Sequence, residues 1–320
     1  MAQSIGEVDE NLSFLTLEVT SQVRRTQRYL QQPAEELLHK IIRRDDYIDR
    51  LRNIIQRKCF NLAAELDPSD RVGLEQLRSL DTITANLERI ADFCESVVAQ
   101  ERHLEHPELL EIAQPTGCLD EILRGLGLVM DAVADPNAAA GLEICRIEAR
   151  LDDYHARTFE TVLKRLDAGG DAQSLVTVLF MSHYFERMGD AMLNIGEAVL
   201  SSTLGERIKL EEYMPLRNSV ERLWSDLEDG DLTIEAIGET RSGCRIDRVS
   251  AAGSSGERMR GFKEGANAKL REERESIELL NERLPGYEPR IYSFEEGPEH
   301  GALLFEHIHG LTIEDCLLSA

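Results

Sequence analysis

The stretch Glu88-Arg89-Ile90-Ala91-Asp92 returns 98 residues later as Glu186-Arg187-Met188-Gly189-Asp190. Residues four apart on an α-helix lie one above the other on one face, so each stretch directs two carboxylates the same way. Like charges at this spacing repel and lower the stability of the helix. An unfavourable arrangement that occurs twice calls for a compensating cation, either a metal ion or a neighbouring arginine or lysine.

A second acidic pair precedes each stretch, Asp45 with Asp49 and, 103 residues later, Glu148 with Asp152. One such pair among 60 Asp and Glu residues carries little information, because charged helix faces normally meet water. Four pairs in register between two halves predict two related sites. The alternative is that these carboxylates form salt bridges between helices, with Arg89, Arg187, Arg44 or Arg146 as partners.

The composition narrows the functional class. A net charge of −24 disfavours nucleic acid, because phosphate binding needs clustered Lys and Arg, and it suits cations or a basic partner. No stretch approaches the roughly 18 apolar residues of a membrane helix, and the acidic N-terminus does not look like a signal peptide. The six cysteines show no C-x-x-C spacing, which indicates reduced thiols. We expect a cytoplasmic protein without membrane insertion.

Apolar residues recur every three or four positions over residues 9–204, which predicts helix almost throughout. The first helix ends near Pro33, a turn capped by Asp70 separates the second and third, and the third reaches Pro107. The second half repeats this plan, with helices to Val133 and over 139–166 and 172–200. We therefore expect a mainly α fold of two antiparallel three-helix bundles, residues 1–108 and 109–205.

The pattern of apolar and polar residues changes after residues 206–231, which we expect to be a charged linker with some helix. Short β-type runs alternate there with turns, and one amphipathic helix over 267–284 interrupts them. The predicted strands are 232–237, 244–249, 258–263, 290–294 and 302–308. Residues 232–320 are thus expected to form a small α+β domain.

Two three-helix units, each with Glu-Arg-x-x-Asp on its last helix and an acidic pair on its middle one, resemble the PhoU family. The resemblance implies a cytoplasmic regulator of phosphate uptake, a homodimer that works at the inner face of the membrane with the phosphate ABC transporter ATPase and its sensor histidine kinase. It also implies metal clusters bound by the acidic pairs. Carried over by position, the ligand candidates are Glu88, Asp92, Glu186, Asp190, Asp45, Asp49, Glu148 and Asp152.

The residue chemistry agrees with a metal site. Carboxylates are hard oxygen donors that suit Mg²⁺, Mn²⁺, Ca²⁺ or iron, so we expect divalent or ferric ions. No Cys or His occurs at matching places in the two halves, which disfavours a zinc-type site. Ser96 follows the first stretch where Asn194 follows the second, so the two sites can differ in affinity.

The C-terminal domain resembles the small lobe of aminoglycoside-phosphotransferase-like kinases. Gly238–Gly243 lies where a phosphate-covering loop would be, although a plain hairpin is the commoner explanation of such a run. Glu273 falls on the apolar face of its helix and needs a cation, for which Lys263 is the natural partner. Glu306 and Ile308 belong to the run where backbone groups would meet adenine. These four residues are the candidate nucleotide site, with ATP as the second candidate ligand.

No catalytic-loop His-x-Asp and no Mg²⁺-binding Asp-x-Gly follows Gly310, so the large lobe of a kinase is missing from the sequence. We therefore expect a non-enzymatic phosphate-signalling regulator with an appended kinase-like module. The alternative is a fragment of a small-molecule or protein kinase, truncated before its large lobe, whose helical bundles serve as a targeting domain.

Overall fold

The computed structural model describes residues 2–134, 137–223, 232–239, 244–251, 259–297, 300–308 and 310. The chain divides into two compact units, Met1–Thr203 and Leu204–Ala320. The described residues of the first unit form six long α-helices and one short 3₁₀ helix. Their bounds are α1 (Ala2–Gln31), α2 (Glu35–Glu65), α3 (Arg71–Glu101), η1 (Pro107–Ala113), α4 (Pro115–Ala134), α5 (Ala138–Asp167) and α6 (Ala172–Leu204).

The predicted mainly helical fold is confirmed, and local signals explain several helix ends. Asp70 caps α3 as expected, since its Oδ1 accepts a hydrogen bond from the Gly73 amide at 2.9 Å. Asn137 caps α5 in the same way, accepting from the Ala140 amide at 2.8 Å. The third helix is shorter than predicted and ends at Glu101. The 3₁₀ helix η1 that follows was not foreseen.

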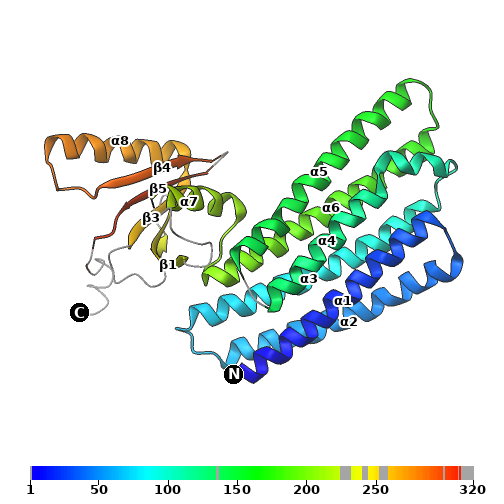
Figure 1. Cartoon of the computed structure of the whole chain (residues 1–320), viewed down its shortest axis with the longest axis horizontal. Coiled ribbons are helices and arrows are strands. Elements are labelled where there is room, and N and C mark those ends of the chain that lie inside the picture. The colour runs from blue at the N-terminus through cyan, green and yellow to red at the C-terminus, as the bar shows by residue number, and fades with distance from the viewer. Residues whose placement is uncertain are drawn as a thin grey trace. The chain divides into compact units, whose positions relative to one another are not determined.

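One apolar core joins all six helices. The helix α1 packs on α2, α3 and α4, while α2 packs on α3 and α4 packs on α5 (Figure 1). A single cluster of buried side chains runs through them and includes residues of α6, such as Met188 and Ile195. The two sets of three helices thus share one core within one unit, and their division into two separate bundles stays a prediction.

The backbones of α5 and α6 approach each other closely at two glycines. A Cβ atom on Gly196 of α6 would lie 2.7 Å from the Gly141 carbonyl oxygen and 2.8 Å from the Cys145 nitrogen of α5. Both distances are shorter than a real Cβ contact allows, so only glycine fits at position 196. This contact holds together the two helices that carry the second set of acidic pairs.

The second unit contains a twisted antiparallel sheet whose five described strands have the order β1-β2-β3-β5-β4. The helices α7 and α8 pack on this sheet (Figure 1). The bounds are α7 (Leu210–Leu223), β1 (Leu232–Glu239), β2 (Arg245–Ala251), β3 (Arg260–Ala266), α8 (Asn267–Arg283), β4 (Ile291–Glu296) and β5 (His300–Glu306). Each predicted strand and the predicted helix is present. Residues 240–243 of the glycine-rich run lie outside the described residues.

The segment expected as a linker contains α7, which packs on β4 and β5. Tyr213, Leu216 and Val220 are buried on one face of α7. This spacing of three and four residues marks an amphipathic helix, but it is obscured in the sequence by the surrounding charges and by Pro215.

A buried polar group lies on the face of the sheet toward α7. Arg245 and Asp247 of β2 form an ion pair with Nε–Oδ2 at 2.9 Å, and Glu264 of β3 is buried nearby. Burial, reinforced by the Glu212 carboxylate of α7, raises the pKa of Glu264 to about 7. Glu264 therefore carries its charge at a cost in the folded chain.

We predict that Gly196→Ala destabilises the first unit by about 1–3 kcal/mol, because the new methyl group forces α5 and α6 apart. The control is Gly127→Ala on α4, where a Cβ meets no atom within 4 Å, so that removing a flexible glycine stabilises the helix by roughly 0.5–1 kcal/mol. Urea unfolding followed by circular dichroism measures both changes. Equal effects of the two substitutions would contradict the close approach.

We predict that Glu264→Gln stabilises the second unit at pH 8 and has little effect at pH 4. The pKa of Glu264 in the folded chain, about 7, lies above its ordinary value of 4.5. The wild-type chain therefore loses stability as the pH rises from 4.5 to about 7, and the loss is complete above that pH. The gain at pH 8 has an upper bound of roughly 3 kcal/mol, at about 1.4 kcal/mol for each unit of pKa. Hydrogen exchange of β3 and β5 amides at the two pH values measures it, and a gain independent of pH would contradict the raised pKa.

Candidate metal centres

The first acidic cluster forms where α2 faces α3. Asp45 and Asp49 lie one turn apart on α2, and Glu88 and Asp92 do the same on α3. Burial raises the pKa of Asp45 to about 7, with further increases from the charges of Asp92, Glu95 and Glu88. Burial and the neighbouring Glu88 also raise the pKa of Asp92 to about 6. The structure therefore brings the four predicted residues together and adds Glu95 as a fifth carboxylate.

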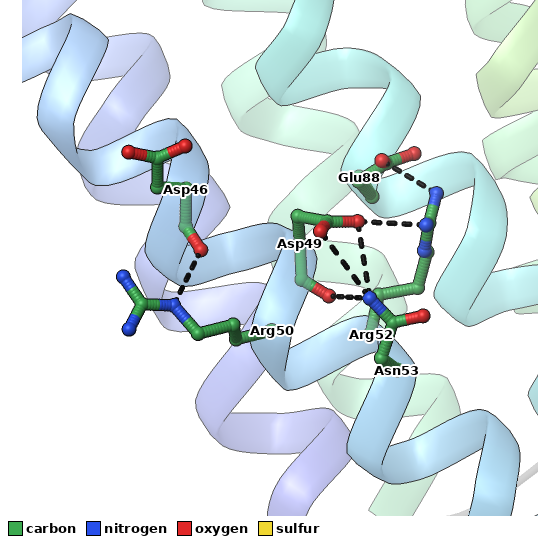
Figure 2. Close-up of polar contacts among 6 residues, drawn as sticks. All are labelled: Asp46, Asp49, Arg50, Arg52, Asn53 and Glu88. Atoms are coloured by element: carbon green, nitrogen blue, oxygen red, sulfur yellow. Dashed lines mark hydrogen bonds and ion pairs between the residues drawn. The ribbon is translucent and has the colours of Figure 1, made fainter.

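An arginine lies inside this first cluster. Arg52 of α2 contacts Glu88 Oε1 through Nη1 at 2.6 Å and Asp49 Oδ1 through Nη2 at 2.7 Å (Figure 2). Asn53 donates a further hydrogen bond to the Asp49 carbonyl at 2.9 Å. Sequence reasoning did not single out Arg52, although its place three residues after Asp49, on the same helix face, was a usable signal.

The second acidic cluster repeats the arrangement between α5 and α6. Burial raises the pKa of Glu148 to about 7, and the charges of Asp152, Asp190 and Glu186 raise it further. The pKa of Asp152 is also raised, by burial first and then by Glu186 and Asp190. The charges of Glu186 and Asp190 on α6 thus act on both carboxylates of α5.

The arginines proposed as salt-bridge partners mostly point elsewhere. Arg187 does contact Asp190, at 2.5 Å between Nη1 and Oδ2, but on its own helix. Arg44 pairs with Glu18, Arg146 pairs with Glu143, and the Arg89 guanidinium lies 6.0 Å from the centre of the Phe93 ring. Among the described residues, Arg52 and Arg187 are the arginines that form ion pairs with the eight candidate ligands.

Two histidines lie beside the second cluster. One potential ligand atom from each of His155, His183 and Glu186 lies within 4.8 Å of the other two. The Nδ1 atom of His183 is 2.7 Å from Oε2 of Glu186. A comparison of the two halves does not reveal these histidines, because His155 and His183 have no counterpart in the first half.

The polar atoms of both clusters suit a bound cation. Oδ1 of Asp45 in the first cluster is buried and accepts no hydrogen bond within the described residues, and Oε2 of Glu186 in the second is buried with His183 Nδ1 as its near contact. A buried oxygen without a donor is costly, and a cation satisfies it. The donors are mainly carboxylate oxygens, the ligands that hard divalent and ferric ions prefer. The residues present therefore fit the metal that the sequence predicted.

The positions after the two Glu-Arg-x-x-Asp stretches differ in their contacts. Ser96 donates to the backbone carbonyl of Asp92 at 3.1 Å. Asn194 instead donates to Asn86 Oδ1 at 3.2 Å, linking α6 to α3 across the two halves. The side chain at this position thus has a different role in each half.

The second unit contains the predicted Lys–Glu pair. Lys263 Nζ on β3 lies 2.7 Å and 2.6 Å from the two carboxylate oxygens of Glu273 on α8. Adjacent strand residues point to opposite faces, so Lys263 faces α8 while Glu264 faces α7.

The other two candidate nucleotide residues lie at the end of β5. The amide of Glu306 donates to the Arg290 carbonyl at 2.8 Å, and Ile308 follows the strand with its side chain exposed. A cavity of about 830 Å³ between α8 and β4 is lined by Glu306 together with Arg274 and Arg290. Lys263, Glu273 and Ile308 do not line it, so the four candidates do not share this cavity.

Similar proteins are known for the helical unit. Over 190 residues the chain is 24% identical to the phosphate-specific transport system accessory protein PhoU homolog of Clostridium acetobutylicum, which covers 57% of this chain and 84% of that protein. It is 25% identical over 223 residues to the PhoU homolog of Caulobacter vibrioides, which covers 64% of this chain and 93% of that protein.

Two crystal structures share the fold. The phosphate transport system regulatory protein PhoU of Streptococcus pneumoniae superposes with a TM-score of 0.58 at 20% identity, covering 65% of this chain and 99% of that one. PhoU of Pseudomonas aeruginosa gives a TM-score of 0.57 at 18% identity, covering 64% of this chain and 99% of that one.

The described helices include none that is both long and apolar enough to cross a bilayer. The PhoU domain model matches residues 13–100 and 119–199, which are parts of the helical unit and contain all eight acidic candidates. Since this match covers more than half of the chain, the protein belongs to the PhoU family.

Proposed function

We propose that this protein is a non-enzymatic, cytoplasmic accessory regulator of phosphate transport. The observation that carries the proposal is the match of the PhoU domain model to both halves of the helical unit. The relatives named above are accessory proteins of phosphate-specific transport systems, and they support the same role here. The partners expected from the family are the transporter ATPase and a sensor histidine kinase, bound by a homodimer.

Two large aromatic side chains of the helical unit are exposed to solvent. Phe60 of α2 is 75% exposed and Phe180 of α6 is 52% exposed. Large apolar groups at a surface are typical of interaction sites when they gather in patches. These side chains are available for contacts with a second copy or with a transporter subunit.

Metal binding is the second part of the proposal. In the first half Asp45, Asp49, Glu88 and Asp92 would hold the ion, and in the second half Glu148, Asp152, Glu186 and Asp190 would do so. A bound cation neutralises carboxylates that repel one another and fixes the distance between α2 and α3 or between α5 and α6. The buried Oδ1 of Asp45, which accepts no hydrogen bond within the described residues, supports this role.

We predict that the combined change Glu88→Gln, Asp92→Asn, Glu186→Gln and Asp190→Asn abolishes metal uptake, because each cluster loses two charged donors. Elemental analysis after reconstitution with Mn²⁺ or Fe³⁺ should find near-stoichiometric metal in the parent and traces in the variant. In a host lacking its own copy, the parent should restore phosphate-responsive uptake of radiolabelled phosphate, and the variant should not.

The matched control neutralises four exposed carboxylates outside the clusters, Glu111, Asp131, Glu160 and Asp167. It changes the net charge equally and should retain both metal and uptake control. Equal trace metal in the parent and the cluster variant would remove metal binding from the proposal. Uptake that is indifferent to the presence of the whole chain would refute the regulatory role.

A second candidate function is nucleotide binding by the C-terminal unit. The Lys263–Glu273 pair favours it, because such a pair orients nucleotide phosphates in kinase small lobes. The antiparallel sheet with α8 between β3 and β4 supports the same resemblance. The proposal extends to binding and not to phosphoryl transfer.

We predict that Lys263→Met lowers the affinity for Mg²⁺–ATP at least about tenfold, since a charge-assisted contact to phosphate contributes about 1.5–3 kcal/mol. Lys269→Met on the exposed face of α8 is the control and should leave the affinity unchanged. Titration of a fluorescent ATP analogue measures both. Identical weak binding by parent and both variants would reject the nucleotide site.

A further inference from the structure

We propose that the second acidic cluster is a mixed nitrogen–oxygen site for a transition metal of the zinc type, with His155, His183 and Glu186 as ligands. The first cluster, which lacks nitrogen donors, is not such a site. This inference rests on the proposed metal binding, because Glu186 belongs to the second cluster, and it adds a difference between the two halves.

The helical spacing places the histidines at one end of the second cluster. On α5, His155 follows Asp152 by three residues and Glu148 by seven, which continues the same helix face. On α6, His183 precedes Glu186 by three residues and Asp190 by seven. Each acidic pair is thus extended by one imidazole, and both imidazoles occur at the same end of the pair of helices.

The geometry of the three groups suits a shared ion. Their ligand atoms lie within 4.8 Å of one another, and the two imidazole rings are 6.0 Å apart between centroids. Oε2 of Glu186 lies 2.7 Å from His183 Nδ1 yet is buried and accepts no well-directed hydrogen bond. Without a metal, His183 and Glu186 form an ion pair when the imidazole is protonated, and a metal ion would replace that proton between the two side chains.

A hydroxyl group positions one of the rings. His155 Nδ1 lies 3.0 Å from the Ser182 hydroxyl of α6. This hydrogen bond holds one nitrogen of the imidazole and leaves Nε2 for a metal. Ligating histidines usually have such a partner on the other ring nitrogen, because it fixes the tautomer and the ring orientation.

The first half has different residues at the matching positions. The offsets of 103 and 98 residues that relate the acidic pairs place Arg52 where the second half has His155, and Ala85 where it has His183. The Arg52 guanidinium contacts both Glu88 and Asp49, at 2.6 and 2.7 Å. The first cluster therefore has the guanidinium of Arg52 where the second has two imidazoles.

Ligand type then decides the metal. Carboxylates alone suit Mg²⁺, Ca²⁺ and Mn²⁺, whereas imidazole nitrogen favours zinc, iron, nickel and copper. Two imidazoles and one carboxylate form a donor set typical of zinc sites that keep an open position. The second cluster should accordingly select Zn²⁺, or its spectroscopic substitute Co²⁺, over Mg²⁺ in large excess.

The first test uses the full chain, stripped of metal and titrated with Co²⁺ in the presence of excess Mg²⁺. The parent should bind one equivalent with visible absorption bands of nitrogen-ligated Co²⁺, and Zn²⁺ should displace it. The double variant His155→Gln/His183→Gln should bind Co²⁺ at least about 100-fold more weakly, since loss of even an outer partner costs about 10–100-fold. Its Mn²⁺ binding should change little, because the carboxylates remain.

The second test transfers the site. The variant Arg52→His/Ala85→His gives the first cluster the residues of the second, so it should gain a second equivalent of Co²⁺ with the same spectrum. The control is Arg52→Ala/Ala85→Gly, which removes the guanidinium without adding nitrogen and should gain none.

The outcomes separate this inference from the metal-binding proposal. One outcome is Mn²⁺ binding that depends on the acidic clusters, with Co²⁺ binding that is the same in the parent and in the histidine double variant. That result would overturn the inference and leave the metal-binding proposal intact. Loss of all metal binding in the parent would overturn both. If the Arg52→His/Ala85→His variant is folded by circular dichroism and gains no second equivalent of Co²⁺, then Arg52 and Ala85 do not set the difference between the halves.

Discussion

The arrangement of the helical unit depends on holding like charges together. Four carboxylates face one another between α2 and α3, joined by Glu95, and four more do so between α5 and α6. Burial, and after it the charges of the neighbouring carboxylates, raises the pKa values of Asp45, Asp92 and Glu148, so that the ionised groups are held in the fold at a cost. The apolar core must supply the opposing free energy, and its continuous set of buried Leu, Ile, Val and Met side chains does so.

Repetition of the acidic pairs conceals a chemical asymmetry. The two halves share the helical plan and the carboxylate spacing, but Arg52 compensates the charge of one cluster and imidazoles border the other. The same duplicated scaffold can thus present two binding sites with different preferences. The contact between Asn86 and Asn194 links the last helices of the two halves close to both clusters.

Much of the architecture could be predicted because it depends on local signals. Short segments carry the helical periodicity, the Asp70 cap and the alternation of β3. The Lys263–Glu273 pair could be predicted because Glu273 faces inward and needs a cation. Family resemblance identified the eight acidic candidates, and the structure brings each set of four together. Their role as metal ligands stays a prediction.

The missed residues were missed for different reasons. Arg52 looks like an ordinary surface charge until α3 places Glu88 beside it. His155 and His183 do not recur between the halves, so a comparison of repeats passes over them. The helix α7 was assigned to a linker because its apolar face becomes apparent only against β4 and β5.

The single core shared by six helices has a consequence for how the protein unfolds. Buried residues from every helix of the first unit belong to one cluster, so removing either set of three helices would expose the apolar face of the other. Neither half can then melt alone without a large cost, and the unit behaves as one cooperative foldon. A ligand bound in one half is therefore expected to slow amide exchange in both halves, because the two repeats would unfold together.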